Sequence, residues 1–287
     1  MGTASPSNSD NESPTVTSVR MPAVAGSFYP AEAAELAASV DLMVHEARVP
    51  IRVEPLGAMI VPHAGYVYSG PVAATAYRRL LDQGRTVRTA IVLGPNHTVP
   101  FDTIALSGFD VWRTPLGEIS VDVELRERLV AARAAVVADD PHLREHAIEV
   151  QLPFLQRILT DGWKLLPAVV GHVPFVRGGA FLDRCWGEED LVVISSDLSH
   201  YLPYEEARRR DRATVDAIVA GDPAAIHPDQ ACGASPVRSL LAATVTASMS
   251  PETLDLRNSG DTAGPRNHVV GYAAIAYHSA LPSFDRL

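Results

Sequence analysis

Residues 191–200 read LVVISSDLSH, an apolar run that leads directly into a loop with an aspartate and a histidine. Two earlier stretches have the same form, GAMIVPHAGY at residues 57–66 and TAIVLGPNH at residues 89–97. Short apolar runs bounded by loops of this kind are typical of buried parallel strands. Three strands that end alike indicate one sheet whose carboxyl ends meet at a shared loop face.

The rest of the chain alternates strand-like and helix-like stretches. Further strands are predicted at residues 165–170 and, interrupted by a glycine, at residues 268–278. Helices are predicted at residues 31–46, 71–81, 123–132, 145–159, 204–220 and 236–248. Ser235 is the expected N-cap of the last one. This alternation predicts a single α/β domain over residues 19–287, with a mostly parallel central sheet flanked by helices.

Composition and charge narrow the class of protein. The 287 residues, 47% of them hydrophobic, are enough to bury a large core without a disulfide framework, and the two cysteines fit a reducing cytoplasm. The 34 acidic residues outnumber the 24 basic ones, which predicts no charge-driven binding of nucleic acid. The run Arg208–Arg210 with Arg212 alternates with acids, a pattern typical of a solvated helix face.

The first 18 residues have a composition unlike the rest. They are rich in Ser, Asn, Thr and Pro and lack a basic start and an apolar stretch, so we expect a disordered tail instead of a signal peptide. Every apolar run in the chain is far shorter than the roughly 20 residues that a membrane helix needs. We therefore expect a cytoplasmic protein with no membrane contact.

Four side chains follow the strands that end alike: His63, His97, Asp197 and His200. Ligands of open α/β sheets bind outside the carboxyl ends of the strands, so these side chains should share one cleft. One histidine after a strand is usually structural, whereas three at equivalent positions indicate a functional site. His200 suits the role of a general acid or base, because histidine titrates near neutral pH.

Cys232 lies in the segment ACGASP, just before the predicted last helix. The dipole of a helix start favours a thiolate, which is the form that binds metal. The alternative is that Cys232 is a small buried hydrophobe. Cys185 has no comparable setting and is interpreted as a buried hydrophobe.

The segment EHAIEVQL at residues 145–152 carries Glu145, His146 and Glu149. On a helix the two glutamates would share a face, where they could orient metal ligands, bind cations or simply stabilise the helix start. His146 and Glu149 have the spacing of an inverted zinc-protease motif, but Val150 stands where its second histidine is needed. That motif is therefore excluded.

Taken together, these motifs resemble the Memo family, known in bacteria and archaea as protein B of the AmmeMemoRadiSam system. The resemblance runs from near residue 20 to the final strand. The matching stretches are AVAGSFY at 23–29, VPHAGYVYSG at 61–70, LGPNH at 93–97, WRTPL at 112–116, EHAIEVQL at 145–152, SSDLSHY at 195–201 and the pair Cys232 and Gly233.

Memo proteins resemble the catalytic subunit of class III extradiol dioxygenases, which are non-haem iron enzymes that open catechol rings. The resemblance implies a class III extradiol dioxygenase-like fold with one metal ion, held by His63, His97 and Cys232. It also implies that Asp197 and His200 line the same pocket. The dioxygenases have a carboxylate in the third ligand position, whereas a thiolate there suits softer ions. Fe(II) or copper is expected ahead of zinc.

Three functions remain open from the sequence. The first is a metal-dependent, dioxygenase-like redox enzyme, and the second is a non-catalytic module that binds a peptide or small molecule in the same cleft. The third is a zinc-dependent hydrolase in which Glu145 or Glu149 activates a metal-bound water. The family's bacterial name further implies a radical SAM protein and an AMMECR-type protein as pathway partners.

Overall fold

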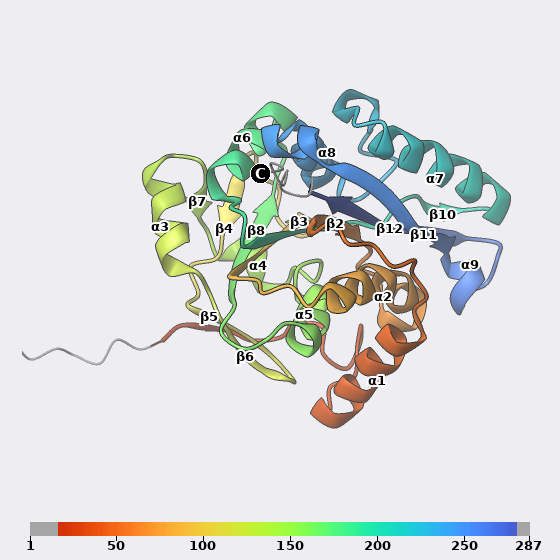
Figure 1. Ribbon diagram of the computed structural model, residues 1–287, viewed down its shortest axis with the longest axis horizontal. Helices are drawn as coiled ribbons and strands as arrows, with labels where there is room; N and C mark the ends of the chain where they lie inside the picture. The colour runs from red at the N-terminus through yellow and green to blue at the C-terminus, as the bar shows by residue number, and fades with distance from the viewer. Residues whose placement is uncertain (1–16, 280–287) are drawn as a thin grey trace, which may run out of the picture.

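The computed structural model describes residues 17–279, and within them a nine-stranded sheet carries helices on both faces (Figure 1). Its centre consists of parallel strands in the order β2 (Leu56–Val61), β9 (Asp190–Ser195), β3 (Thr89–Pro95) and β8 (Lys164–Val170). These strands coincide with the four apolar runs predicted inside the chain. The α/β fold with a parallel centre is thus confirmed.

The margins of the sheet are antiparallel. Beside β2 lies β12 (Val269–His278), which also pairs with β11 (Ser250–Asn258) and with β10 (His200–Leu202). At the other margin β4 (Ile104–Leu106) pairs antiparallel to β8 and carries β7 (Val136–Val137). A separate small sheet contains β1 (Val19–Arg20), β5 (Val111–Thr114) and β6 (Gly117–Ser120). The whole sheet is therefore mixed, and the prediction of a mostly parallel sheet holds for its centre.

The strands β2, β3, β8 and β9 divide their side chains between two cores. In β2, Met59 and Val61 belong to one core, and Ala58 and Ile60 belong to the other. This alternation is the period of two expected for a strand that is buried on both faces. The first core includes side chains from α1 (Ala33–Glu46), α2 (Tyr66–Gln83) and α5 (Leu152–Ile158). The second includes side chains from α3 (Val123–Ala131), α6 (Phe175–Cys185), α7 (Tyr204–Val219) and α8 (Ala234–Ala242).

The predicted helix at residues 145–159 is wrong in its first half. The chain forms α4 (Asp140–Leu143), an irregular turn, the 3-10 helix η1 (Glu149–Gln151) and then α5. Glu145 lies in the turn, so it does not share a helical face with Glu149. Its carboxylate accepts the main-chain N–H groups of His146 and Ala147, and such side-chain contacts compete with helical hydrogen bonding.

The predicted helix at residues 236–248 is also shifted. α8 begins at Ala234 with Gly233 as its N-cap, so Ser235 lies inside the helix and is not the cap. After Ala242 the chain continues into the 3-10 helix η3 (Thr244–Ser248). The remaining short elements are η2 (Pro223–Ala225) and α9 (Ser259–Thr262).

Residues 1–16 of the predicted tail lie outside the described residues. Ser18, which the prediction also assigned to the tail, instead donates from its hydroxyl to the Asp110 carboxylate at 3.0 Å, and its carbonyl accepts the Val111 N–H. This backbone pairing leads into β1. In the part of the chain that the structure describes, no helix is long and apolar enough to cross a membrane.

Gly179 gives a test of the packing between α6 and α8. A Cβ added there would lie 2.5 Å from the Ala242 carbonyl oxygen, which belongs to the backbone of α8. A glycine-to-alanine change inside a helix normally stabilises by about 0.5–1 kcal/mol. We expect Gly179→Ala instead to lower the free energy of unfolding by about 1–3 kcal/mol, because the helices must move apart. Urea denaturation measures the sign, and stabilisation would contradict this packing.

Candidate metal centre

Three histidines converge beyond the carboxyl ends of the central strands. His63 follows β2, His97 follows β3, and His146 comes from the turn between α4 and η1. Each offers a ring nitrogen, and these atoms lie within 4.8 Å of one another. The ring centroids are 5.0 Å apart for His97 and His146 and 5.3 Å apart for His63 and His97. Such a set of imidazoles could hold one metal ion.

Glu145 holds two of these histidines in place. Its buried carboxylate accepts the His97 main-chain N–H at 2.8 Å and pairs with His97 Nδ1 at 2.9 Å. The same carboxylate accepts the N–H groups of His146 and Ala147, each at 2.9 Å. A carboxylate that accepts from Nδ1 fixes the orientation of the ring and leaves Nε2 for a ligand, as is common around bound metals. Glu145 thus has the supporting position that the sequence allowed.

His63 is fixed by a different set of contacts. Its main-chain N–H donates to Asp197 Oδ1 at 2.8 Å, and its Nδ1 lies 3.0 Å from Ser195 Oγ. The Ser195 hydroxyl donates its single proton to the Ala147 carbonyl at 2.6 Å, so its oxygen must accept from His63 Nδ1. His63 Nε2 therefore carries the free lone pair, and it lies 3.1 Å from Cys232 Sγ.

Burial and charge set the protonation of the three imidazoles. Burial, assisted by repulsion from His97, lowers the pKa of His63 to about 3. Burial and the charge of His63 lower the pKa of His146 to about 4. Burial also lowers the pKa of His97, but its hydrogen bond to Glu145 and the charge of Glu145 outweigh this and raise it overall. Two of the three imidazoles are thus neutral near pH 7, which is the form that binds metal.

Cys232 lies beside this cluster, at the start of α8. Its Sγ contacts His63 Nε2 and accepts the Asp197 N–H at 3.3 Å. Burial, followed by the charge of Asp197, raises the pKa of the thiol. In the absence of a metal ion, burial thus opposes the thiolate that the helix start was expected to favour, and the role of Cys232 as a ligand stays a prediction. Within the described residues, the three-histidine cluster does not extend to this sulfur.

A cleft of about 660 Å³ opens over the three histidines, and Asp197 and His200 line it as predicted. Asp197 is buried, and burial raises its pKa. His200 is exposed on β10, with Nδ1 2.9 Å from the Leu198 carbonyl oxygen. Since a carbonyl can only accept, Nδ1 is the donor in this contact, and Nε2 is not engaged by it. The other walls of the cleft include the aromatic side chains of Phe28, Tyr68, Tyr201 and Tyr272.

Glu149 does not line the cleft. It is fully buried and forms an ion pair with Arg20, which is also buried, and it accepts the Tyr29 hydroxyl. Arg20 donates to the carbonyls of His142 at 3.1 Å and Glu145 at 2.8 Å. Sequence reasoning missed Arg20, because a single arginine before the stretch MPAVAGSFYP carries no recognisable signal. This ion pair connects the N-terminal strand to the segment that carries His146.

Arg20→Met tests this connection. The change leaves the Glu149 charge buried without its cation, so we expect the free energy of unfolding to fall by about 3–5 kcal/mol. Arg113→Met is the matched control, because the ion pair of Arg113 with Glu118 is exposed and should contribute less than about 1 kcal/mol. Urea denaturation of both variants gives the comparison. An Arg20→Met loss as small as that of the control would contradict a structural role for the buried pair.

Comparisons with known proteins identify the family of this chain. Residues 20–276 match the family described as Memo-like protein. A MEMO1 family protein of Aeropyrum pernix is 40% identical over 279 residues, covering 90% of this chain and 99% of the relative. One from Aquifex aeolicus is 38% identical over 271 residues, with the same coverage. An uncharacterized protein from Escherichia coli K12 aligns in structure at a TM-score of 0.48 and 12% identity, over 77% of this chain and 99% of that chain. On the family match and the curated relatives, the chain belongs to the Memo family.

Proposed function

We propose that this protein binds one metal ion through His63, His97 and His146 and carries out metal-dependent redox chemistry on a small molecule in the cleft. The observation that supports this most directly is the convergence of the three ring nitrogens within 4.8 Å. The hydrogen bond from His97 to Glu145 adds to it, since a supporting carboxylate of this kind is a feature of metal sites. The redox part rests on the resemblance to extradiol dioxygenases.

The choice of the third ligand departs from the sequence-based set of His63, His97 and Cys232. His146 faces both other histidines, with ring centroids 5.4 Å from His63 and 5.0 Å from His97. Cys232 contacts His63 alone among the three. A cation bound at His63 Nε2 would nevertheless lie near the sulfur, so Cys232 is the available fourth ligand. Imidazole and thiol donors accept Fe(II), copper and zinc alike, so we keep Fe(II) or copper ahead of zinc on the resemblance to the dioxygenases.

The residues around the metal have separable roles in this proposal. The metal, when bound, supplies a Lewis acid with accessible redox states. His200, on the wall of the cleft, takes a proton from the substrate or returns one through Nε2, the ring nitrogen that the Leu198 contact does not use. Asp197 holds the His63 backbone and adds negative charge beside the metal. Phe28, Tyr68 and Tyr272 give the cleft apolar walls suited to a small planar molecule.

A zinc-dependent hydrolase would need Glu145 or Glu149 as its general base, and the contacts of both carboxylates speak against this role. Glu145 accepts donors from His97, His146 and Ala147, and Glu149 is bound to Arg20, Tyr29 and the N–H groups of Ala23 and Val24. Neither carboxylate is free to activate a water molecule. A binding module for a peptide or small molecule remains the alternative, with the same metal but no turnover. A cytoplasmic setting, with a radical SAM protein and an AMMECR-type protein in the same pathway, completes the proposal.

Metal analysis of four variants decides the ligand set. We expect His63→Ala, His97→Ala and His146→Ala to lose most of the metal that the wild-type protein retains after purification without an affinity tag. Cys232→Ser should keep more than half of it, because the three imidazoles remain. Circular dichroism confirms folding in each variant. Full metal in His146→Ala together with loss in Cys232→Ser would restore the sequence-based ligand set.

Oxygen uptake separates chemistry from binding. With Fe(II) supplied and catechol as the probe, we expect O₂ consumption by the wild-type protein. His200→Ala should reduce it by about 10²-fold or more while metal content stays unchanged, because a positioned acid or base contributes about that factor. Asp197→Ala should likewise impair uptake with the metal retained. A metal-loaded wild-type protein that binds catechol without consuming O₂ would favour the binding module.

A further inference from the structure

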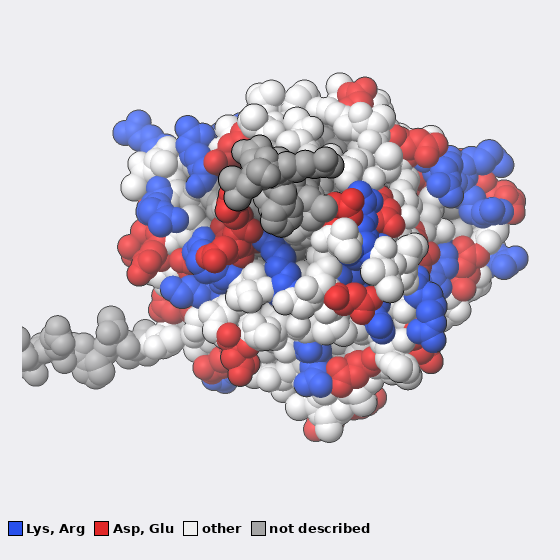
Figure 2. Space-filling model, in the orientation of Figure 1, with Lys and Arg blue, Asp and Glu red and all other residues white. Residues whose placement is uncertain are grey.

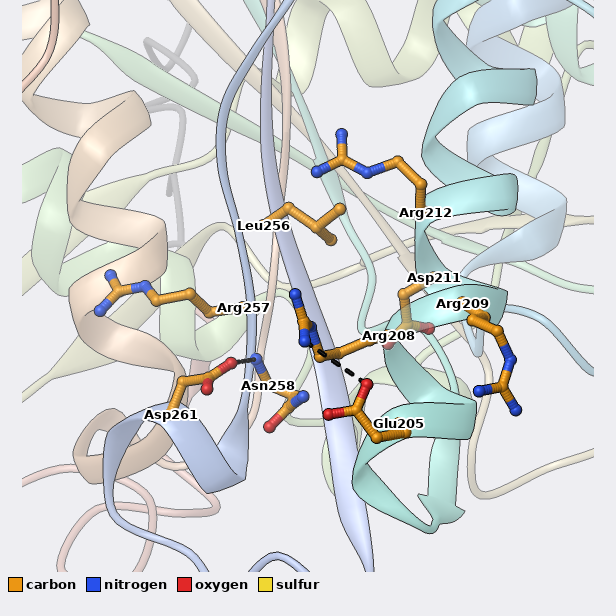
Figure 3. A pocket seen from close by; sticks show the side chains of 9 residues that line it. All are labelled: Glu205, Arg208, Arg209, Asp211, Arg212, Leu256, Arg257, Asn258 and Asp261. Carbon is orange, nitrogen blue, oxygen red and sulfur yellow. Dashed lines mark hydrogen bonds and ion pairs between the residues drawn. The ribbon is translucent and has the colours of Figure 1, made fainter.

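A second pocket, of about 450 Å³, lies between α7 and β11 (Figure 3). Arg208 and Arg212 stand on one of its walls, and Leu256 and Asn258 belong to the strand opposite. The two arginines are four residues apart on α7, so they share one face of the helix. The sequence predicts a solvated helix face here. In the structure, part of that face lines a pocket shared with β11.

The acidic residues around this pocket already have other contacts. Asp211 is buried and accepts the Ser199 N–H at 3.0 Å, with Gly271 packed against its carboxylate. Asp261 accepts the Asn258 N–H at 3.1 Å and the Tyr204 hydroxyl. Both carboxylates therefore already accept hydrogen bonds from groups of the chain.

The arginines are less fully paired. Glu205 contacts Arg208 at 3.4 Å, which is a long distance for an ion pair. Within residues 17–279 the structure gives Arg212 no ion pair or hydrogen bond, while Arg210, on another face of α7, is bound to Asp229. Figure 2 shows blue side chains gathered at the right-hand edge of the molecule, where α7 lies in Figure 1. The lining of the pocket has four arginines and three acidic residues, a formal excess of one positive charge in a chain whose formal charge is -10.

We propose that this pocket binds the phosphate group of a small-molecule ligand, with the guanidinium groups of Arg208 and Arg212 as donors. Guanidinium groups present paired N–H donors whose geometry matches phosphate oxygens, and these charge-assisted hydrogen bonds are the strong ones. The acidic chain as a whole repels anions, so affinity has to come from these short-range contacts. The proposal is independent of the metal centre, because none of these residues belongs to the histidine cluster.

Isothermal titration calorimetry with inorganic phosphate tests the proposal on the full chain, treated with a chelator and held at constant ionic strength. We expect the wild-type protein to bind phosphate, and Arg208→Gln and Arg212→Gln each to weaken binding by about tenfold or more, as for the loss of a hydrogen bond to a charged group. Arg210→Gln is the matched control on the same helix and should leave the affinity unchanged. All three side chains lie at the surface or are partly exposed, so the variants should fold.

Three results would overturn the proposal. The first is the absence of phosphate binding by the wild-type protein. The second is equal affinity in all three arginine variants, since the pocket pair would then contribute nothing. The third is loss of phosphate binding in His63→Ala with retention in Arg212→Gln, which would locate the anion at the histidine cluster.

Discussion

The carboxylate of Glu145 is the contact on which the histidine cluster depends. A buried carboxylate is stable only when its charge is met by donors, and Glu145 has donors from His97, His146 and Ala147. Burial alone would raise its pKa, but the hydrogen bond and charge of His97, with the backbone donors, lower it to about 2. The same contacts prevent a helix at this point. The non-helical turn before η1 is thus what allows His146 to lie beside His97.

A second buried charge supports the same segment from behind. Glu149 lies four residues further along the chain and contacts Arg20 and the N-terminal segment instead of lining the cleft. Arg20 also donates to the Glu145 carbonyl and lies over the Trp112 ring, 4.4 Å from its centroid. Two glutamates from one short segment therefore contact opposite sides of it. One orients the histidines, and the other attaches their segment to a strand from the start of the chain.

How much of this was predictable depends on the range of the interactions involved. The apolar runs before His63, His97 and Asp197 predict the central strands and the edge of the sheet at which the site lies. They do so because a buried strand has a local apolar pattern. β11 escaped prediction, since Glu252, Asp255 and Arg257 interrupt any apolar pattern. The break in the helix at Glu145 escaped it for another reason: besides the local N–H groups, the Glu145 carboxylate accepts donors from His97, 48 positions away in the chain. A helical sequence pattern carries no information about a contact between residues so far apart in the chain.

The contacts of Cys232 depend, through His63, on the hydroxyl proton of Ser195. Ser195 uses its only proton on the Ala147 carbonyl, which makes His63 Nδ1 a donor and His63 Nε2 a base. A neutral thiol is a suitable neighbour for that base, and burial raises the pKa of Cys232 in agreement with it. The sulfur is therefore satisfied without being a thiolate. A cation at Nε2 would reverse this preference, because a nearby metal favours the thiolate. Metal binding and proton release at Cys232 are then linked through a single imidazole nitrogen, whose lone pair is set by a serine hydroxyl on the neighbouring strand.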